Sequence, residues 1–251
     1  MGRTAAVAAL HQRFPADTKA AETPSEDDTM TYTVSRTASP IGLNGDWEAP
    51  AWATADTADI AVFRPESSEH RPRTQVRLLY DDTALHGIFR VEDQYVRCVH
   101  EGFQQPVCRD SCVEFFFKPD IGRGYMNLEL SCGGSFLCYH VHDWRRIGDE
   151  GLAGFTPLSA DLGQTIGVWH SLPRRIEPEL SEPTTWVLQF RLPLTVVEAF
   201  TGDLGPLQGR RWSGNFYKCG DQTSHPHWAS WAPVRALNFH LPECFDELLF
   251  A

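Results

Sequence analysis

The feature that most constrains the fold is a pair of neighbouring runs, Cys108–Pro119 and Tyr125–Leu130, joined by a glycine-rich turn. In the second run every second residue is apolar, which is the period-two pattern of a strand with one buried face, and the first run follows the pattern less cleanly through Val113, Phe115 and Phe117. The glycines between the runs supply the permissive backbone that a tight turn needs. The two runs therefore predict a hairpin at the centre of the molecule.

Pairing of these strands would place Glu114, Asn127 and Glu129 together on the face opposite the apolar one. Such a polar face is either a recognition surface or a solvated one, and the alternation alone leaves both interpretations open. Cys112 lies between Asp110 and Glu114, whose negative charge should raise the pKa of its thiol and argues against a nucleophilic role.

A second hairpin is predicted where Asp81–Thr83 separates the alternating runs Thr74–Tyr80 and Ala84–Val91. Many short strands joined by turns, with almost no sustained helical period, favour an all-β fold. We therefore expect an antiparallel β-sandwich, jelly-roll-like, forming a single domain with long loops.

The rest of the chain is divided by composition. Residues 1–29 are predicted to be a disordered tail, because their polar run cannot bury apolar surface, and residues 30–251 to be the domain; Met30 is a candidate for the true start. We expect a loop-rich segment over 143–183 and a short helix over 194–200. Four further strand regions are expected at 135–142, 185–192, 211–217 and 238–250.

Charge and cysteine content limit the partners and the compartment. A formal net charge of -11 argues against a nucleic-acid partner, which would need a basic footprint. No run is long and apolar enough to cross a membrane, so no membrane partner is expected. Seven cysteines without a CxxC motif favour reduced thiols and a cytoplasmic location over a secreted one.

Several motifs in order resemble the family 9 carbohydrate-binding modules and their stand-alone relatives, from about residue 32 to the end of the chain. These motifs are Leu43–Trp47 with Pro50–Trp52, Val76–Asp82 with Ala84–Leu85, Asp110–Phe116, Gly214–Asp221, Trp231–Pro233 and Asn238–Glu243.

The resemblance implies a single antiparallel β-sandwich that binds a mono- or oligosaccharide, in some members the reducing-end units of plant polysaccharides, with calcium in a structural role. In the modules attached to xylanases the sugar lies between two tryptophan rings, and no pair of tryptophans here matches that arrangement by motif. Calcium prefers oxygen ligands, and the candidates are Asp81, Asp82, Glu92 and Asp93.

Sugar binding needs flat aromatic faces for stacking and planar polar groups that reach neighbouring hydroxyls. We expect tryptophans outside regular strands and the polar face of the central hairpin to supply them. The candidate ligand-binding residues are Arg109, Asp110, Glu114, Asn127, Glu129, Trp144, Asn215, Lys218, Trp228 and Trp231, with Asp221 as an extension.

An alternative hypothesis is a sugar-active enzyme built on the same sandwich. Glycoside hydrolases use two carboxyl groups, one as acid and one as nucleophile or base. Glu114 and Glu129 are the catalytic candidates under that hypothesis, because neighbouring strands would hold them side by side.

Overall fold

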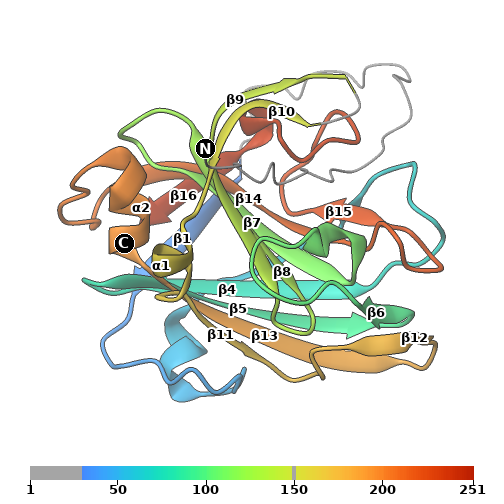
Figure 1. The fold of residues 1–251 in the computed structure, drawn as a ribbon. Coiled ribbons are helices and arrows are strands. Elements are labelled where there is room, and N and C mark those ends of the chain that lie inside the picture. Colours follow the sequence, from blue (N-terminus) through green and yellow to red (C-terminus); the bar gives the residue numbers. More distant parts are fainter. Residues whose placement is uncertain (1–29, 149–150) are drawn as a thin grey trace, which may run out of the picture.

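Two β-sheets pack face to face in the computed structural model, which describes residues 30–148 and 151–251. The first sheet carries the central hairpin and runs obliquely across the second (Figure 1). In spatial order its strands are β10 (Leu152–Pro157), β9 (Phe136–Arg146), β8 (Tyr125–Ser131), β7 (Cys112–Lys118), β14 (Arg211–Cys219), β16 (Asp246–Phe250) and β1 (Thr31–Arg36). Two short strands, β15 (Trp228–Ser230) and β3 (Val62–Phe63), extend it beside β14.

The second sheet shares β1 with the first. Residues Thr31 to Val34 pair with β16, and Ser35 and Arg36 pair with the second sheet, so one strand joins the two layers. Both pairings of β1 are parallel, whereas the other strand pairs are antiparallel. The remaining strands of this sheet are β4 (Arg73–Tyr80), β5 (Ala84–Asp93), β13 (Thr184–Pro193) and β11 (Gly167–His170), with β2 (Thr57–Asp59) beside β4.

Short elements connect and flank the sheets. A two-stranded ladder of β6 (Val96–Cys98) and β12 (Ile176–Leu180) lies at one end of the sandwich. In the described residues the helical elements are the α-helices α1 (Ala160–Gly163) and α2 (Leu194–Thr201) and the 3-10 turns η2 (Pro50–Thr54), η3 (Val107–Arg109) and η4 (Pro242–Cys244).

The main core fills the space between the sheets. Phe115 of β7 stacks on Phe117 and Phe216, with ring centroids 4.7 Å and 5.0 Å away, and all three rings are fully buried. Phe190 of β13 reaches Phe115 from the opposite sheet at 6.2 Å. Burying each such ring contributes about 1.5–3 kcal/mol. The apolar residues that alternate along the strands of both sheets therefore hold the two sheets together.

Several sequence-based predictions are confirmed. The all-β sandwich, both hairpins and the helix after residue 193 are present. Trp47 and Trp52 pack in a small cluster against the second sheet. Gly45 has a φ of 70°, and a Cβ there would lie 1.8 Å from the Trp169 ring, so this position requires glycine. The seven cysteines are free thiols.

Other predictions are wrong in detail. The segment from 143 to 183 is not mainly loop, because β9 extends to Arg146 and β10, α1, β11 and β12 follow it. These strands are short and interrupted by glycine and proline, so the alternation could not reveal them. At the C-terminus only Asp246–Phe250 is a strand. The predicted disordered tail, residues 1–29, lies outside the described residues.

Candidate functional site

The central hairpin holds its two glutamates side by side. Glu114 of β7 and Glu129 of β8 are directly opposite each other in the strand pairing, and side chains paired in this way project from the same face of a sheet. That face points away from the second sheet, and we call it the outer face. The prediction that Glu114, Asn127 and Glu129 share one face is confirmed.

Cross-strand pairing extends the outer face into two rows of side chains. One row places Glu114 between Glu129 on β8 and Tyr217 on β14. The next row runs from Ser131 through Cys112 and Cys219 to Trp228, which the short strand β15 supplies. The outer face thus combines carboxyl groups, thiols and aromatic rings in adjacent positions.

The two carboxyl groups are buried, which distinguishes this face from an ordinary solvated one. Glu114 is 1% exposed and Glu129 is 7% exposed. Burial raises the pKa of Glu129 to about 8, and the pKa of Glu114 lies well above its usual range because of burial and the neighbouring Glu129. At neutral pH such a carboxyl keeps its proton and can both donate and accept a hydrogen bond.

Neutral donors hold each carboxyl in place. The Asn127 amide donates to Glu129 Oε1 at 2.9 Å, and the Cys219 thiol donates to Glu114 Oε1 at 3.1 Å. Asn127 Oδ1 in turn accepts from the backbone N–H of Tyr139 at 2.8 Å. Asn127 is therefore a positioning residue for Glu129, and not itself an open polar group.

Aromatic side chains surround the carboxyl pair. The Tyr217 ring stacks on Phe239 at a centroid distance of 4.1 Å, and the Tyr139 ring on Phe155 at 4.7 Å. The half-buried Trp228 donates from its indole Nε1 to Asp221 Oδ1 at 2.7 Å. Flat rings beside buried polar groups are what stacking on a sugar ring requires.

Lys218 was predicted to contribute to the ligand-binding site, and this prediction is wrong in its placement: Lys218 is not on the outer face. It is paired with Val113 and points to the inner face, where it is fully buried. Its Nζ lies 3.4 Å from Asp93 Oδ2 and 2.7 Å from Nε2 of His227. The alternation of β14 puts this lysine inside, and Asp93 makes that burial possible.

Trp231, Asp110 and Asn215 have structural roles. Trp231 belongs to the main core, edge-on to Tyr32 at 6.2 Å. Asp110 is fully buried and accepts from Arg97 and from two backbone N–H groups of the segment after β6. The Asn215 amide bridges the backbone at Ala232.

Two further candidates lie near the rim of the outer face. Trp144 is half-buried beside Tyr125, with ring centroids 6.3 Å apart, and packs against the buried residues of the outer face. Arg109 is half-buried in η3, the turn directly before β7. The structure thus keeps Glu114, Glu129, Trp144 and Trp228 in one region and directs Lys218 and Trp231 elsewhere.

The four calcium candidates do not come together. Asp81 and Asp82 lie at the turn before β5, where they bond to His86 and Arg36, respectively. Glu92 and Asp93 lie at the opposite end of that strand, and Asp93 is bonded to His70 and Trp186. They cannot act as one ligand set, because a strand of this length separates the two pairs.

Sequence reasoning missed the residues that cover and complete the outer face. Phe239, Phe155 and Tyr217 come from three separate parts of the chain, and no local spacing links them. Cys112 and Cys219 were not connected either, although the resemblance motifs contain both. Paired strands bring them together, and strand pairing between distant segments has no short-range signal.

The sequence model of carbohydrate-binding family 9 matches residues 51–250 of the chain. The chain belongs to carbohydrate-binding family 9. The resemblance inferred from the ordered motifs is thereby confirmed, and the match includes the central hairpin and β14.

Solved structures share the fold. A Bacteroides uniformis protein provisionally described as carbohydrate-binding is 24% identical, with a TM-score of 0.77, over 89% of this chain and 100% of that one. A family 9 module from Caldicellulosiruptor kristjanssonii bound to glucose is 14% identical, with a TM-score of 0.55, over 88% of this chain and 96% of that one. A Caldicellulosiruptor kristjanssonii family 9 module bound to cellotriose is 15% identical, with a TM-score of 0.55, over 88% of this chain and 93% of that one.

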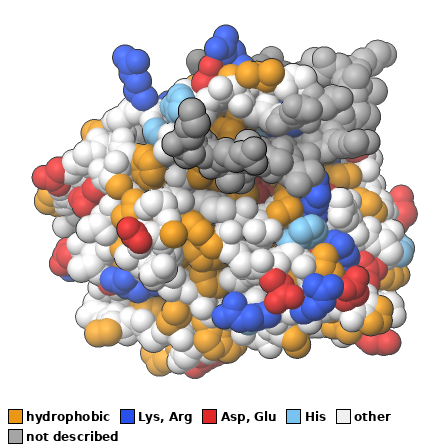
Figure 2. Space-filling view, viewed as in Figure 1, with side chains coloured by type: hydrophobic (Ala, Val, Ile, Leu, Met, Phe, Trp, Pro, Cys, Tyr) orange, Lys and Arg blue, Asp and Glu red, His pale blue; other side chains and the backbone are white. Residues whose placement is uncertain are grey.

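No curated protein matches the chain. In the part of the chain that the structure describes, no helix has the length and apolar character needed to cross a membrane. On the molecular face seen in Figure 2, acidic and basic side chains lie among one another. The expectations of no nucleic-acid partner and of a cytoplasmic location stay predictions.

Proposed function

We propose that this family 9 protein binds a mono- or oligosaccharide on its outer face, with Glu129 as the principal polar contact and Trp228 as the stacking surface. The observation that carries the proposal is the buried carboxyl pair flanked by aromatic rings on one sheet face. Family membership supports the ligand class, and two neighbours of the same fold were solved with glucose and cellotriose.

Glu129 is better suited to the sugar than Glu114. It retains 7% of its surface exposed against 1% for Glu114, and Asn127 fixes its orientation from behind. With its pKa raised to about 8, its neutral carboxyl offers one donor and one acceptor, which matches a sugar hydroxyl. Trp228 is half-buried, and its Nε1 bond to Asp221 holds the indole plane in place.

Calorimetric titration of the protein with glucose, cellotriose and a panel of other sugars measures the binding affinity and tests this proposal. Trp228→Ala should weaken binding about tenfold, since loss of one stacked ring costs roughly 1.4 kcal/mol. Trp169→Phe is the matched control, because it removes a half-buried tryptophan from β11 in the other sheet and should leave binding unchanged. Equal affinities for wild type and Trp228→Ala, with both folded, would place the sugar elsewhere.

Two substitutions of Glu129 separate binding from catalysis. Glu129→Leu should weaken binding about tenfold or more, because it removes both hydrogen-bonding atoms. Glu129→Gln keeps a donor and an acceptor and should retain binding. If wild type cleaves an oligosaccharide and Glu129→Gln does not, the glycoside hydrolase alternative is correct; its supporting observation is the raised pKa of the carboxyl pair.

A further inference from the structure

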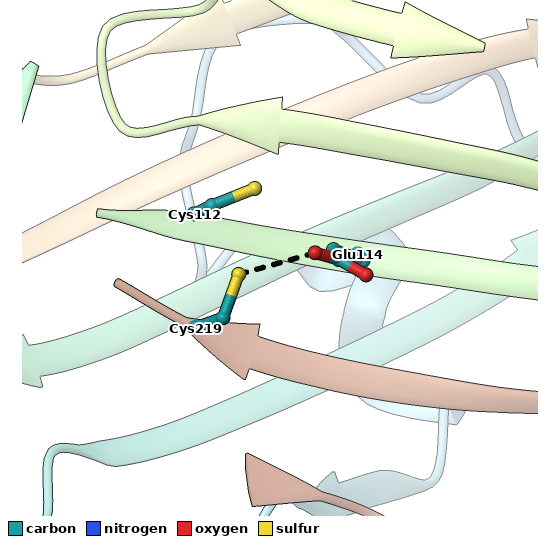
Figure 3. Close-up of side chains that lie close together, drawn as sticks. All are labelled: Cys112, Glu114 and Cys219. Atoms are coloured by element: carbon teal, nitrogen blue, oxygen red, sulfur yellow. Dashed lines mark hydrogen bonds between the residues drawn. The ribbon is translucent and has the colours of Figure 1, made fainter. Parts of the chain in front are cut away.

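Two thiols and a carboxyl group converge on the outer face beside the proposed sugar site. The Sγ atoms of Cys112 and Cys219 and a carboxyl oxygen of Glu114 all lie within 4.8 Å of one another. Cys112 and Cys219 are directly paired across β7 and β14, and Glu114 is two residues along β7 on the same face. Figure 3 shows the three side chains close together, with the Cys219 thiol directed at the Glu114 carboxyl.

The surroundings of Glu114 indicate that this group is built to hold a cation. The carboxyl is 1% exposed, and its one hydrogen bond among the described residues is with the Cys219 thiol, a weak donor. No arginine, lysine or histidine of the described chain forms an ion pair with it. Buried glutamates are almost always paired, so a proton or a metal ion has to balance this one.

The donor types and their spacing select the kind of metal. Thiolates combined with a carboxylate suit Zn²⁺, whereas calcium and magnesium prefer oxygen ligands alone. Two thiolates bound to one Zn²⁺ at about 2.3 Å lie roughly 3.8 Å apart in a tetrahedron. The two Sγ atoms lie within 4.8 Å of each other on strands that are already paired. Small side-chain adjustments would therefore bring them to the separation that Zn²⁺ requires.

We propose that Cys112, Glu114 and Cys219 form a binding site for Zn²⁺ or a similar thiophilic divalent cation. The three buried side chains supply two sulfur ligands and one oxygen ligand. Binding releases the two thiol protons and the carboxyl proton of Glu114 to solvent and leaves the oxidation states of sulfur and metal unchanged. The inference does not depend on sugar binding, because it uses only this chain and a metal ion.

Cobalt(II) is the probe, since it replaces zinc in tetrahedral sites and absorbs visible light. Titration of the reduced full chain under anaerobic conditions should show one Co²⁺ per chain, with thiolate-to-cobalt charge-transfer absorption that Zn²⁺ removes. Cys112→Ser and Cys219→Ser should each lower the Co²⁺ affinity at least tenfold and reduce that absorption. A wild-type protein without charge-transfer absorption would overturn the proposal.

Two further variants test whether the metal binds specifically to these three side chains. Cys98→Ser is the matched control, because Cys98 is a buried thiol bonded to Ser131 and Arg174, outside the group, and should leave affinity within twofold. Glu114→Gln retains both thiols, so charge-transfer absorption should persist while affinity falls at least tenfold. Charge-transfer absorption that survives in the folded Cys112→Ser/Cys219→Ser double variant would also overturn the site.

Discussion

Replacing Lys218 by methionine is expected to lower the free energy of unfolding by about 3–5 kcal/mol. The ammonium group is fully buried and lies 3.4 Å from the equally buried Asp93 carboxylate. Its removal leaves the Asp93 charge without its cation, and His227 Nε2 loses the partner 2.7 Å away. Urea unfolding at neutral pH, monitored by tryptophan fluorescence, measures the loss.

Lys118→Met is the matched control for this experiment. Lys118 ends β7 in an exposed position, so its replacement should change the free energy of unfolding by less than about 0.5 kcal/mol. Adding Asp93→Asn to Lys218→Met should recover part of the loss, because the double variant no longer buries an unbalanced charge. A Lys218→Met protein as stable as Lys118→Met would show that the ion pair does not stabilise the core.

Acidification below pH 6.5 is expected to remove the stability that His227 contributes, while the raised pKa values of Glu114 and Glu129 act in the opposite direction over the same range. Burial and the neighbouring Lys218 lower the pKa of His227 to about 3, while the unfolded chain binds a proton near pH 6.5. Stability from this group is therefore fully present above pH 6.5 and is lost as pH falls toward 3. The shift corresponds to about 5 kcal/mol over that range.

Unfolding free energies measured from pH 7 to pH 4 test this expectation. His227→Gln should remove the acid limb that His227 contributes, so its free energy of unfolding should rise relative to wild type as pH falls below 6.5, since the glutamine carbonyl can still accept from Lys218 and does not become charged. His142→Gln removes an exposed histidine from β9 and should leave the acid limb in place. The pKa of Asp93 is also lowered, despite its burial, by Lys218 and His70, so a further loss is expected below pH 4. An acid limb unchanged in His227→Gln would contradict the assignment.

Local alternation in the sequence determined the strands and the faces of the central hairpin. Every second residue of β7 and β8 is apolar, and a period of two fixes which side chains point inward whatever the rest of the chain does. For the same reason Glu114 and Glu129 could be placed on one face before any contact was known. The turn at Asp81–Thr83 was equally local, because its composition ends one strand and begins the next.

Lys218 shows where the sequence was interpreted incorrectly. It has the same parity in β14 as Phe216 and therefore faces the core, but a lysine is ordinarily placed in water. Its burial depends on Asp93 at the end of β5 and on His227 in the segment directly before β15. Only the folded sandwich reveals that the charge is balanced there.

The tertiary structure alone decided what covers the outer face and which thiols meet on it. Cys219 and Glu114 are 105 residues apart in the chain, yet the thiol lies 3.1 Å from the carboxyl oxygen. Pairing between strands β7 and β14 depends on how the whole sheet is assembled, and residues so distant carry no spacing that predicts it. Burial of Glu114 and Glu129 distinguishes the candidate site from a solvated sheet face. That burial also depends on residues from distant parts of the chain, so only the tertiary structure reveals it.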